Sequence, residues 1–140
     1  MRLKLTLLLI ICLWALPAYA VDLDIIAQIE SSNNPQAVSF RGAKYGRGLH
    51  QISEICLKEY NNYNGTRYIP EDLFDVDINT IIADWYLNKR IPTMLVHYGI
   101  EVRLEAILWA YNAGIGRVVE GFMPEETKKY IKKYKGKSDR

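Results

Sequence analysis

Apolar residues recur at helical spacing along most of the chain, and no segment shows the convincing alternation of a strand. The pattern is clearest after residue 75, where the residues that return every three or four positions are Ile78, Ile81, Ile82, Trp85 and Tyr86. We expect these side chains to face the core from a helix that begins at Asp75 or Asp77. The pattern predicts an all-α, or mainly α, domain with short loops.

Start and stop signals place two helices in the first half of the chain. The first, capped by Asp22 or Asp24, is predicted to run to about Glu30, because serine, asparagine and proline residues follow at once. Residues 31–47 are expected to form a loop. A second helix is predicted over residues 49–60, with an apolar inner face to which Ile55 belongs.

The second half of the chain contains a proline that interrupts the helical pattern. Pro92 predicts a kink or break near residues 90–91, after which a helical segment resumes to residue 98. Residues 101–111 are predicted to form the most buried helix. Pro124 and the acidic residues that follow it predict a last helix that runs to residue 134.

Residues 1–20 have the organisation of a secretory signal peptide. A basic start precedes an apolar run over residues 5–16, and small residues for cleavage follow at 18–20. The run is shorter than the roughly 20 apolar residues of a membrane span, so an uncleaved anchor is the lesser alternative. We therefore predict a periplasmic or secreted domain over residues 21–140, with no stable membrane span after cleavage.

Charge is distributed unevenly in this predicted mature chain. Loss of Arg2 and Lys4 lowers the number of Lys plus Arg from 18 to 16, which equals the 16 Asp plus Glu. Basic residues crowd the tail over residues 128–140. Contact with anionic wall polymers or lipid head groups is one interpretation of this tail, and a solvated helix face is the simpler one. Neutrality and export together predict no nucleic-acid partner.

Several kinds of chemistry are excluded by the residues that the mature chain lacks. Cys56 is its only cysteine, so an intramolecular disulfide cannot form, and its apolar neighbours predict a buried, unreactive thiol. His50 and His97 are the only histidines, too few for a metal cluster. The chain also lacks a Gly-rich phosphate loop. We therefore predict no metal and no cofactor.

Glu30 is the strongest single candidate for catalysis. It ends an apolar helix beside a loop, and partial desolvation there favours the protonated form of a carboxyl group, which suits a general acid. A structural carboxylate at a helix end is the plainer alternative. Tyr111 and Asn112 close the most buried helix with a hydroxyl and an amide, which suit either a polar ligand or a helix cap. Gln51, near a glycine, is a weaker candidate.

Four segments, taken in order, resemble the motifs of soluble lytic transglycosylases. They are Glu30-Ser31 with Asn34-Pro35 and Ser39; Gly48-Leu49-His50-Gln51-Ile52; Ala110-Tyr111-Asn112-Ala113-Gly114 with Arg117-Val118; and Glu126-Thr127 with Tyr130. The resemblance covers nearly all of the predicted mature chain. It implies a lysozyme-like helical fold, similar to goose-type lysozyme, with the active-site groove between helices. It also implies cleavage of the β-1,4 bond between N-acetylmuramic acid and N-acetylglucosamine in peptidoglycan, with a 1,6-anhydromuramic product.

The resemblance assigns roles to particular residues. It implies that Glu30 is a single catalytic acid/base, that Tyr111 and Asn112 face the bond to be cut, and that the aromatic residue of the last motif lies close to Glu30. The positions that it marks as substrate-binding are Ser39, Gln51, Tyr111, Asn112 and Tyr130. Two departures stand out. His50 replaces an apolar residue that is usually methionine, and the loop over residues 42–48 is longer than usual. Both are expected to touch the groove and to alter subsite preference.

Two alternatives to a lytic transglycosylase stay open. A hydrolytic muramidase needs a second carboxylate, for which Asp75, Asp77 or Asp84 are candidates. A non-catalytic peptidoglycan-binding accessory protein would not need Glu30. The expected partners are glycan strands of peptidoglycan. Wall opening for a secretion, conjugation or other envelope-spanning machine, phage entry and wall turnover all fit, and the sequence does not choose among them.

Overall fold

The computed structural model describes residues 19–41 and 44–140. Of the predicted signal peptide, residues 1–18 lie outside the described residues. The described chain is mainly helical with one small sheet, which confirms the predicted fold class. No helix in this part of the chain is both long and apolar enough to cross a membrane.

The first helix, α1 (Leu23–Ser31), begins and ends close to its predicted bounds. The Asp22 carboxylate accepts hydrogen bonds from the backbone N–H groups of Asp24 and Ile25, which identifies the cap. Ser32 ends the helix in the left-handed conformation, with φ 54°. Glu30 therefore lies on the last turn of a helix that is fixed at both ends.

The predicted loop over residues 31–47 is wrong, because it contains a β-hairpin. Strands β1 (Val38–Arg41) and β2 (Lys44–Arg47) pair antiparallel, and β2 also pairs with β3 (Ile52–Ser53). These strands are four residues long at most. A segment this short offers too few positions for a period of two to be recognised.

The second helix, α2 (Glu54–Asn64), begins five residues later than predicted. Residues 48–51 form a turn in which Gly48 and Gln51 both have positive φ, and Ser53 caps the helix by accepting from the N–H of Cys56. The later start changes which side chains face inward. Ile55 was predicted to be internal and is 70% exposed, whereas Cys56 is buried as predicted.

Residues 76–97 form a continuous helical rod built from α3 (Val76–Trp85), a π-helical turn (Tyr86–Arg90) and α4 (Ile91–His97). The π-helical turn stands where a kink or break was predicted. It ends two residues before Pro92, accommodates the missing proline N–H, and does not interrupt the rod. Ile81 was predicted to be internal and is 53% exposed. It lies about 100° around the helix from Ile82, outside the apolar face.

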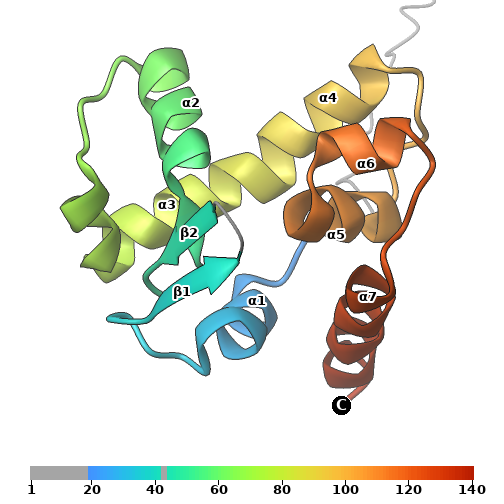
Figure 1. Cartoon of the computed structure of the whole chain (residues 1–140), viewed down its shortest axis with the longest axis horizontal. Coiled ribbons are helices and arrows are strands. Elements are labelled where there is room, and N and C mark those ends of the chain that lie inside the picture. Colours follow the sequence, from blue (N-terminus) through green and yellow to red (C-terminus); the bar gives the residue numbers. More distant parts are fainter. Residues whose placement is uncertain (1–18, 42–43) are drawn as a thin grey trace, which may run out of the picture.

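The remaining helices are α5 (Leu104–Ala113), α6 (Ile115–Val119) and α7 (Glu125–Ser138). α5 begins three residues and ends two residues later than predicted, and α7 begins beside Pro124 as predicted but extends beyond residue 134. In Figure 1 the rod crosses the molecule, with the strands and α2 beside α3 and with α5 and α6 beside α4.

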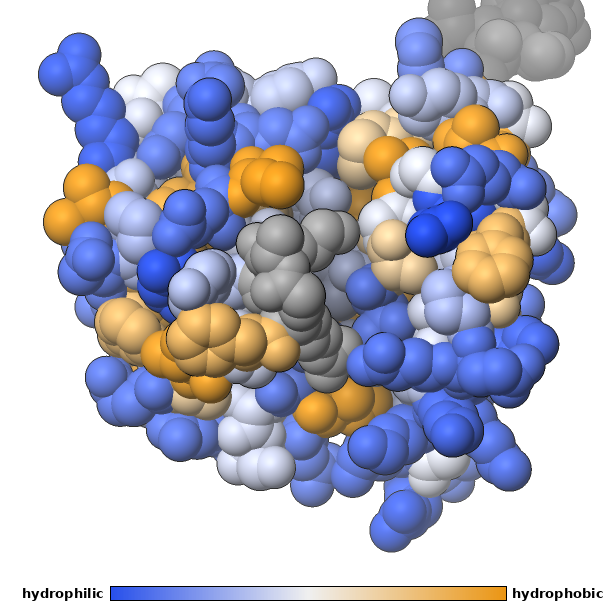
Figure 2. Space-filling model, viewed as in Figure 1, coloured by the Kyte–Doolittle hydropathy of each residue, from blue (hydrophilic) through white to orange (hydrophobic). Residues whose placement is uncertain are grey.

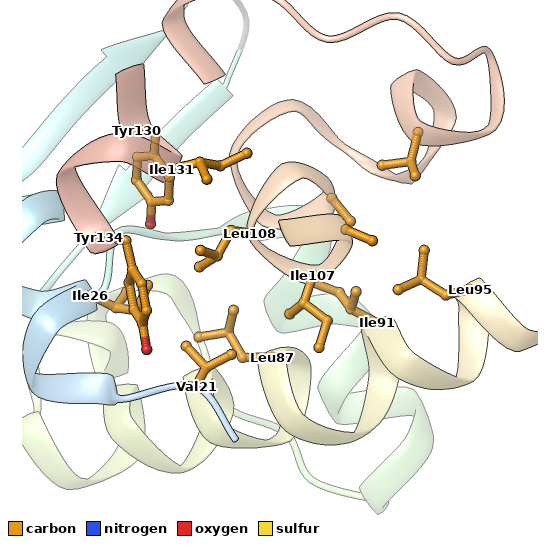
Figure 3. Packing of buried hydrophobic residues seen from close by; sticks show 13 residues of the cluster. Val21, Ile26, Leu87, Ile91, Leu95, Ile107, Leu108, Tyr130, Ile131 and Tyr134 are labelled. Atoms are coloured by element: carbon orange, nitrogen blue, oxygen red, sulfur yellow. The ribbon is translucent and has the colours of Figure 1, made fainter. Parts of the chain in front are cut away.

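Two apolar cores lie along this rod. The larger core joins α1, the rod, α5 and α7, and the side chains that Figure 3 labels in it are Val21, Ile26, Leu87, Ile91, Leu95, Ile107, Leu108, Tyr130, Ile131 and Tyr134. The smaller core packs α2 against α3, and its buried members are Ile52, Cys56, Leu57, Tyr60, Leu73, Ile82 and Ala83. Leu23 and Tyr86 pack against both.

Gly48 is a position where only glycine fits, which gives a first testable prediction. Its φ is +76°, and a Cβ there would lie 2.0 Å from the carbonyl oxygen of Leu73 and 2.3 Å from Nδ2 of Asn79. We expect Gly48→Ala to lower the free energy of unfolding by at least about 2 kcal/mol. Gly65→Ala is the matched control, because Gly65 has φ +67° and nothing within 4 Å of its Cβ position. It should cost about 1 kcal/mol. Urea denaturation of both variants checks this, and equal losses would contradict it.

Candidate active site

One cleft brings together five of the six residues that the sequence predicts for the site. Its lining includes Glu30 from α1, Ser39 from β1, Gln51 from the turn, and Tyr111 and Asn112 from α5. Tyr45, Gly46 and Tyr86 also line it. The cleft therefore lies between the hairpin and the end of α5, and Figure 1 shows where these elements stand in the fold.

Glu30 is half-buried at the edge of this cleft. The residue after it fixes the helix end to the turn, because the Ser31 hydroxyl donates to the carbonyl oxygen of Leu49 at 2.7 Å. Among the described residues that line the cleft, Glu30 is the only one with a carboxylate. The cleft thus presents one acid to whatever occupies it.

Tyr111 faces Glu30 from α5 and is held by a strong hydrogen bond. Its hydroxyl donates to the backbone carbonyl of His50 at 2.6 Å. Burial raises the pKa of Tyr111 well above its ordinary value, and the negative charge of Glu30 raises it further. Tyr111 therefore stays a neutral phenol, and its interaction with Glu30 shows that the two groups are close.

Gln51 organises the hairpin wall of the cleft. It adopts a left-handed backbone, with φ 55°, and its Nε2 donates to the carbonyls of Ala37 and Gly48. Its Oε1 accepts from the hydroxyl of Ser39. A Cβ at Gly46 would lie 2.8 Å from that Oε1, so the glycine allows the amide to pack against β2. Both donors of the Gln51 amide are used within the protein, and the Ser39 oxygen still has lone pairs to offer the cleft.

Asn112 presents an amide whose two ends differ. Its Oδ1 accepts from the hydroxyl of Thr127 at 2.8 Å, which fixes the amide orientation. Its Nδ2 is buried and has no hydrogen-bond partner among the described residues. A buried donor without a partner costs free energy, and this one belongs to a residue that lines the cleft. A carbonyl oxygen of a ligand would satisfy it.

Tyr130 is the predicted site residue that does not line the cleft. It is 5% exposed and belongs to the larger core, where it comes from α7 (Figure 3). Tyr111, which lines the cleft, packs against the same core. Tyr130 therefore supports the cleft wall from behind.

The prediction that His50 touches the groove is wrong for its side chain. The residue is 1% exposed, because the turn directs Gln51 to the cleft and His50 to the interior. Its Nδ1 lies 3.0 Å from Oδ1 of Asn79 and its Nε2 lies 3.2 Å from the carbonyl oxygen of Leu23. Burial lowers the pKa of His50 below its ordinary value, and the two polar contacts and the charge of Asp24 oppose this shift. Of the longer loop, Tyr45 and Gly46 do line the cleft.

Asn79 is a structural residue of the site that the sequence interpretation missed. It is fully buried on α3, and its Oδ1 accepts from the backbone N–H of His50 at 2.9 Å. Its Nδ2 donates to the carbonyls of Arg47 and Leu73 at 3.0 and 2.8 Å. The available signal was a lone amide beside Ile78 on an apolar helix face, since a buried amide must find partners.

The other carboxylates considered for catalysis lie elsewhere. Asp75 caps α3 and Asp84 accepts from the amide of Asn88. Neither these two nor Asp77 line the cleft. The described residues also contain no group of three or more His, Cys, Asp and Glu side chains arranged to hold a metal ion.

Comparison with known families gives one match. The model of the transglycosylase SLT domain matches residues 20–134, a range that includes all six predicted site residues. No curated protein and no solved structure gives a significant match to the chain.

Proposed function

The chain belongs to the transglycosylase SLT domain family, whose members act on peptidoglycan, and we propose that it is a lytic transglycosylase with Glu30 as its single acid/base. The observation that carries this proposal is the cleft itself. One carboxylate lines it, and that carboxylate faces a neutral tyrosine and an amide with a free donor. A glycosidase that hydrolyses its substrate usually needs two carboxylates on either side of the scissile bond.

The proposed reaction uses Glu30 twice. In the first step the protonated carboxyl group donates its proton to the oxygen between N-acetylmuramic acid and N-acetylglucosamine, and the bond from C1 of the muramic acid to that oxygen breaks. In the second step the ionised Glu30 accepts the proton of the C6 hydroxyl as its oxygen bonds to C1. Glu30 ends the cycle protonated, the released sugar carries a new hydroxyl, and the other product is the 1,6-anhydro ring. An intramolecular nucleophile has a large proximity advantage over a bound water.

The polar groups around Glu30 have positioning roles in this proposal. Nδ2 of Asn112 is a fixed donor that has no partner among the described residues, and it suits the carbonyl oxygen of an N-acetyl group. The Ser39 oxygen, with its hydroxyl hydrogen committed to Gln51, suits a sugar hydroxyl or amide donor. Tyr111 is held to the His50 carbonyl and gives the cleft a rigid aromatic wall. Rigid groups lose little entropy when the strand binds.

The mass of the released fragments distinguishes the proposed reaction from hydrolysis. We expect purified sacculi digested by this protein to release muropeptides with anhydromuramic ends, which are lighter by one water molecule than hydrolysed reducing ends. Mass spectrometry of the soluble products measures this directly. Reducing ends alone would favour a hydrolytic muramidase. Binding to sacculi without any release of fragments would favour a non-catalytic accessory protein.

The proposal also covers export and the division of the chain into a signal peptide and one domain. We infer that residues 1–20 act as a signal peptide and that residues 21–140 act in the periplasm or outside the cell, where peptidoglycan is found. The basic segment over residues 128–140 belongs to α7 as far as Ser138, so this tail is part of the folded domain. Local wall opening for an envelope-spanning machine is one setting that suits a small exported enzyme of this kind.

A further inference from the structure

A second groove lies between the end of α1 and the C-terminal half of α7. Its α1 side is formed by Gln28, Ile29, Ser32 and Asn33. Its α7 side is formed by Lys132, Lys133, Gly136, Lys137 and Arg140. We call these nine residues the basic groove. In Figure 2 hydrophilic side chains dominate the surface over α7.

The cations of the basic groove differ in their partners from Lys128 and Lys135 of the same helix. Elsewhere on α7, Lys128 forms an ion pair with Glu125 at 2.5 Å and Lys135 forms one with Glu105 at 3.2 Å. In the groove, Lys137 donates to the neutral amide of Gln28 at 2.9 Å. Among the described residues, no Asp or Glu side chain lines the groove or forms an ion pair with its four cationic side chains. The groove therefore attracts anions.

The basic groove adjoins the proposed catalytic position. Residues 28 and 29, which line the groove, directly precede Glu30. Residues 32 and 33, which also line it, directly follow Ser31. One turn of α1 thus contributes to both the cleft and the groove. The four cations of the groove come from α7, which packs against α1.

We propose that the basic groove binds the carboxylates of the peptide stems on the glycan strand held in the cleft. This inference rests on the proposed function. The sugars of such a strand are uncharged, and the anionic groups that it carries are the carboxylates of the peptides attached to its muramic acid residues. Exposed charge pairs of this kind are individually weak and screened by salt. The groove therefore adds affinity and substrate preference, whereas the chemical step depends on Glu30.

The test compares two variants of equal charge change. In the full chain, Lys132, Lys133 and Lys137 are replaced together by glutamine. The matched control replaces Lys128, Lys129 and Lys135 of the same helix, none of which lines the groove. The substrates are purified glycan strands with their peptides and the same strands after an amidase has removed the peptides. The treated strands, called bare strands, keep one lactyl carboxylate on each muramic acid but lack the carboxylates of the peptide. We expect the groove variant to raise KM on peptide-bearing strands on the order of tenfold, with kcat unchanged, and to leave KM on bare strands unchanged. The control should match the wild type.

A binding measurement keeps this proposal separate from the catalytic one. The same substitutions are made in the Glu30→Gln background, and cosedimentation with intact sacculi is compared with cosedimentation with amidase-treated sacculi. The proposal predicts that only the groove substitutions weaken binding, and only to peptide-bearing sacculi. Cosedimentation with vesicles of anionic phospholipid is measured in parallel. Equal losses in the control, equal losses on amidase-treated sacculi, or a loss confined to the vesicles would overturn it. Failure of the wild type to cut any strand would instead overturn the proposed function, and the sedimentation result would still decide the groove.

Discussion

Glu30→Gln abolishes the cutting of sacculi and leaves the fold intact, if the proposed mechanism holds. Glutamine has nearly the same shape and a similar helix propensity, and Glu30 is only half-buried on a helix that Asp22 and Ser32 already cap. The variant loses the acidic proton that Glu30 donates to the glycosidic oxygen in the proposed first step. General acid catalysis contributes roughly 10² to 10⁴ in rate, and the same carboxyl group serves both proposed steps. We therefore expect kcat to fall by at least about a thousandfold.

The loss of turbidity of a sacculus suspension measures this activity, and a thermal melt of the variant shows that it is folded. Asp84→Asn is the matched control, because Asp84 is the kind of second carboxylate that a hydrolytic muramidase would need and it lies outside the cleft. Its oxygen can still accept from Asn88 after the change. Full activity is expected for Asp84→Asn. Retained activity in Glu30→Gln would end the assignment of Glu30, and a large loss in Asp84→Asn would support the muramidase.

The helices could be predicted from the sequence because their ends carry chemical signals. Asp22 and Asp75 each accept two backbone N–H groups at a helix start, as their positions before apolar residues indicated. Pro92 indicated the irregularity in the rod, which is a π-helical turn. These features depend on residues close together in the chain. Local physics is therefore sufficient for them, and the mainly α fold follows.

The hairpin and the turn depend on contacts between distant residues, and local patterns do not reveal them. β1 and β2 are stabilised by pairing with each other. Position 48 requires glycine because Leu73, which precedes α3, and Asn79, which lies on α3, leave no room for a Cβ. His50 illustrates the same point. Its motif position suggested a groove residue, and its burial is decided by partners at positions 23 and 79.

The sequence identified five residues that line the cleft, but not the residues that hold their side chains in place. Glu30, Ser39 and Tyr111 come together although they are far apart in sequence, as the order of motifs implied. Spacing alone could not show which residues support them. Thr127 orients the Asn112 amide, and the His50 carbonyl holds the Tyr111 hydroxyl. Thr127 and the His50 carbonyl form hydrogen bonds with polar groups that are buried. Which polar groups need such a partner can be told only when burial is known.

Asn79→Ala is expected to destabilise the protein by about 3 to 5 kcal/mol. The substitution removes four polar contacts at once: those to the N–H and the ring of His50, and those to the carbonyls of Arg47 and Leu73. Each buried group left without a partner costs about 1 to 3 kcal/mol, and partial relaxation keeps the sum below the simple total. Natural domains are stable by only about 5 to 15 kcal/mol, so this loss is a large fraction. Urea denaturation measures it.

The same substitution also tests the link between the buried network and the cleft, because Asn79 holds the turn that carries Gln51 and the carbonyl partner of Tyr111. At a temperature where the variant is still folded, we expect kcat to fall by about tenfold or more, since small misplacements of a site reduce rates steeply. Asn88→Ala is the matched control. Asn88 lies on the same rod and accepts from the N–H of Val21, but it is remote from the turn. It should cost about 1 kcal/mol and leave the activity of the folded protein unchanged. If both variants lost stability and activity in equal measure, Asn79 would be an ordinary core residue, and the turn would hold its shape without it.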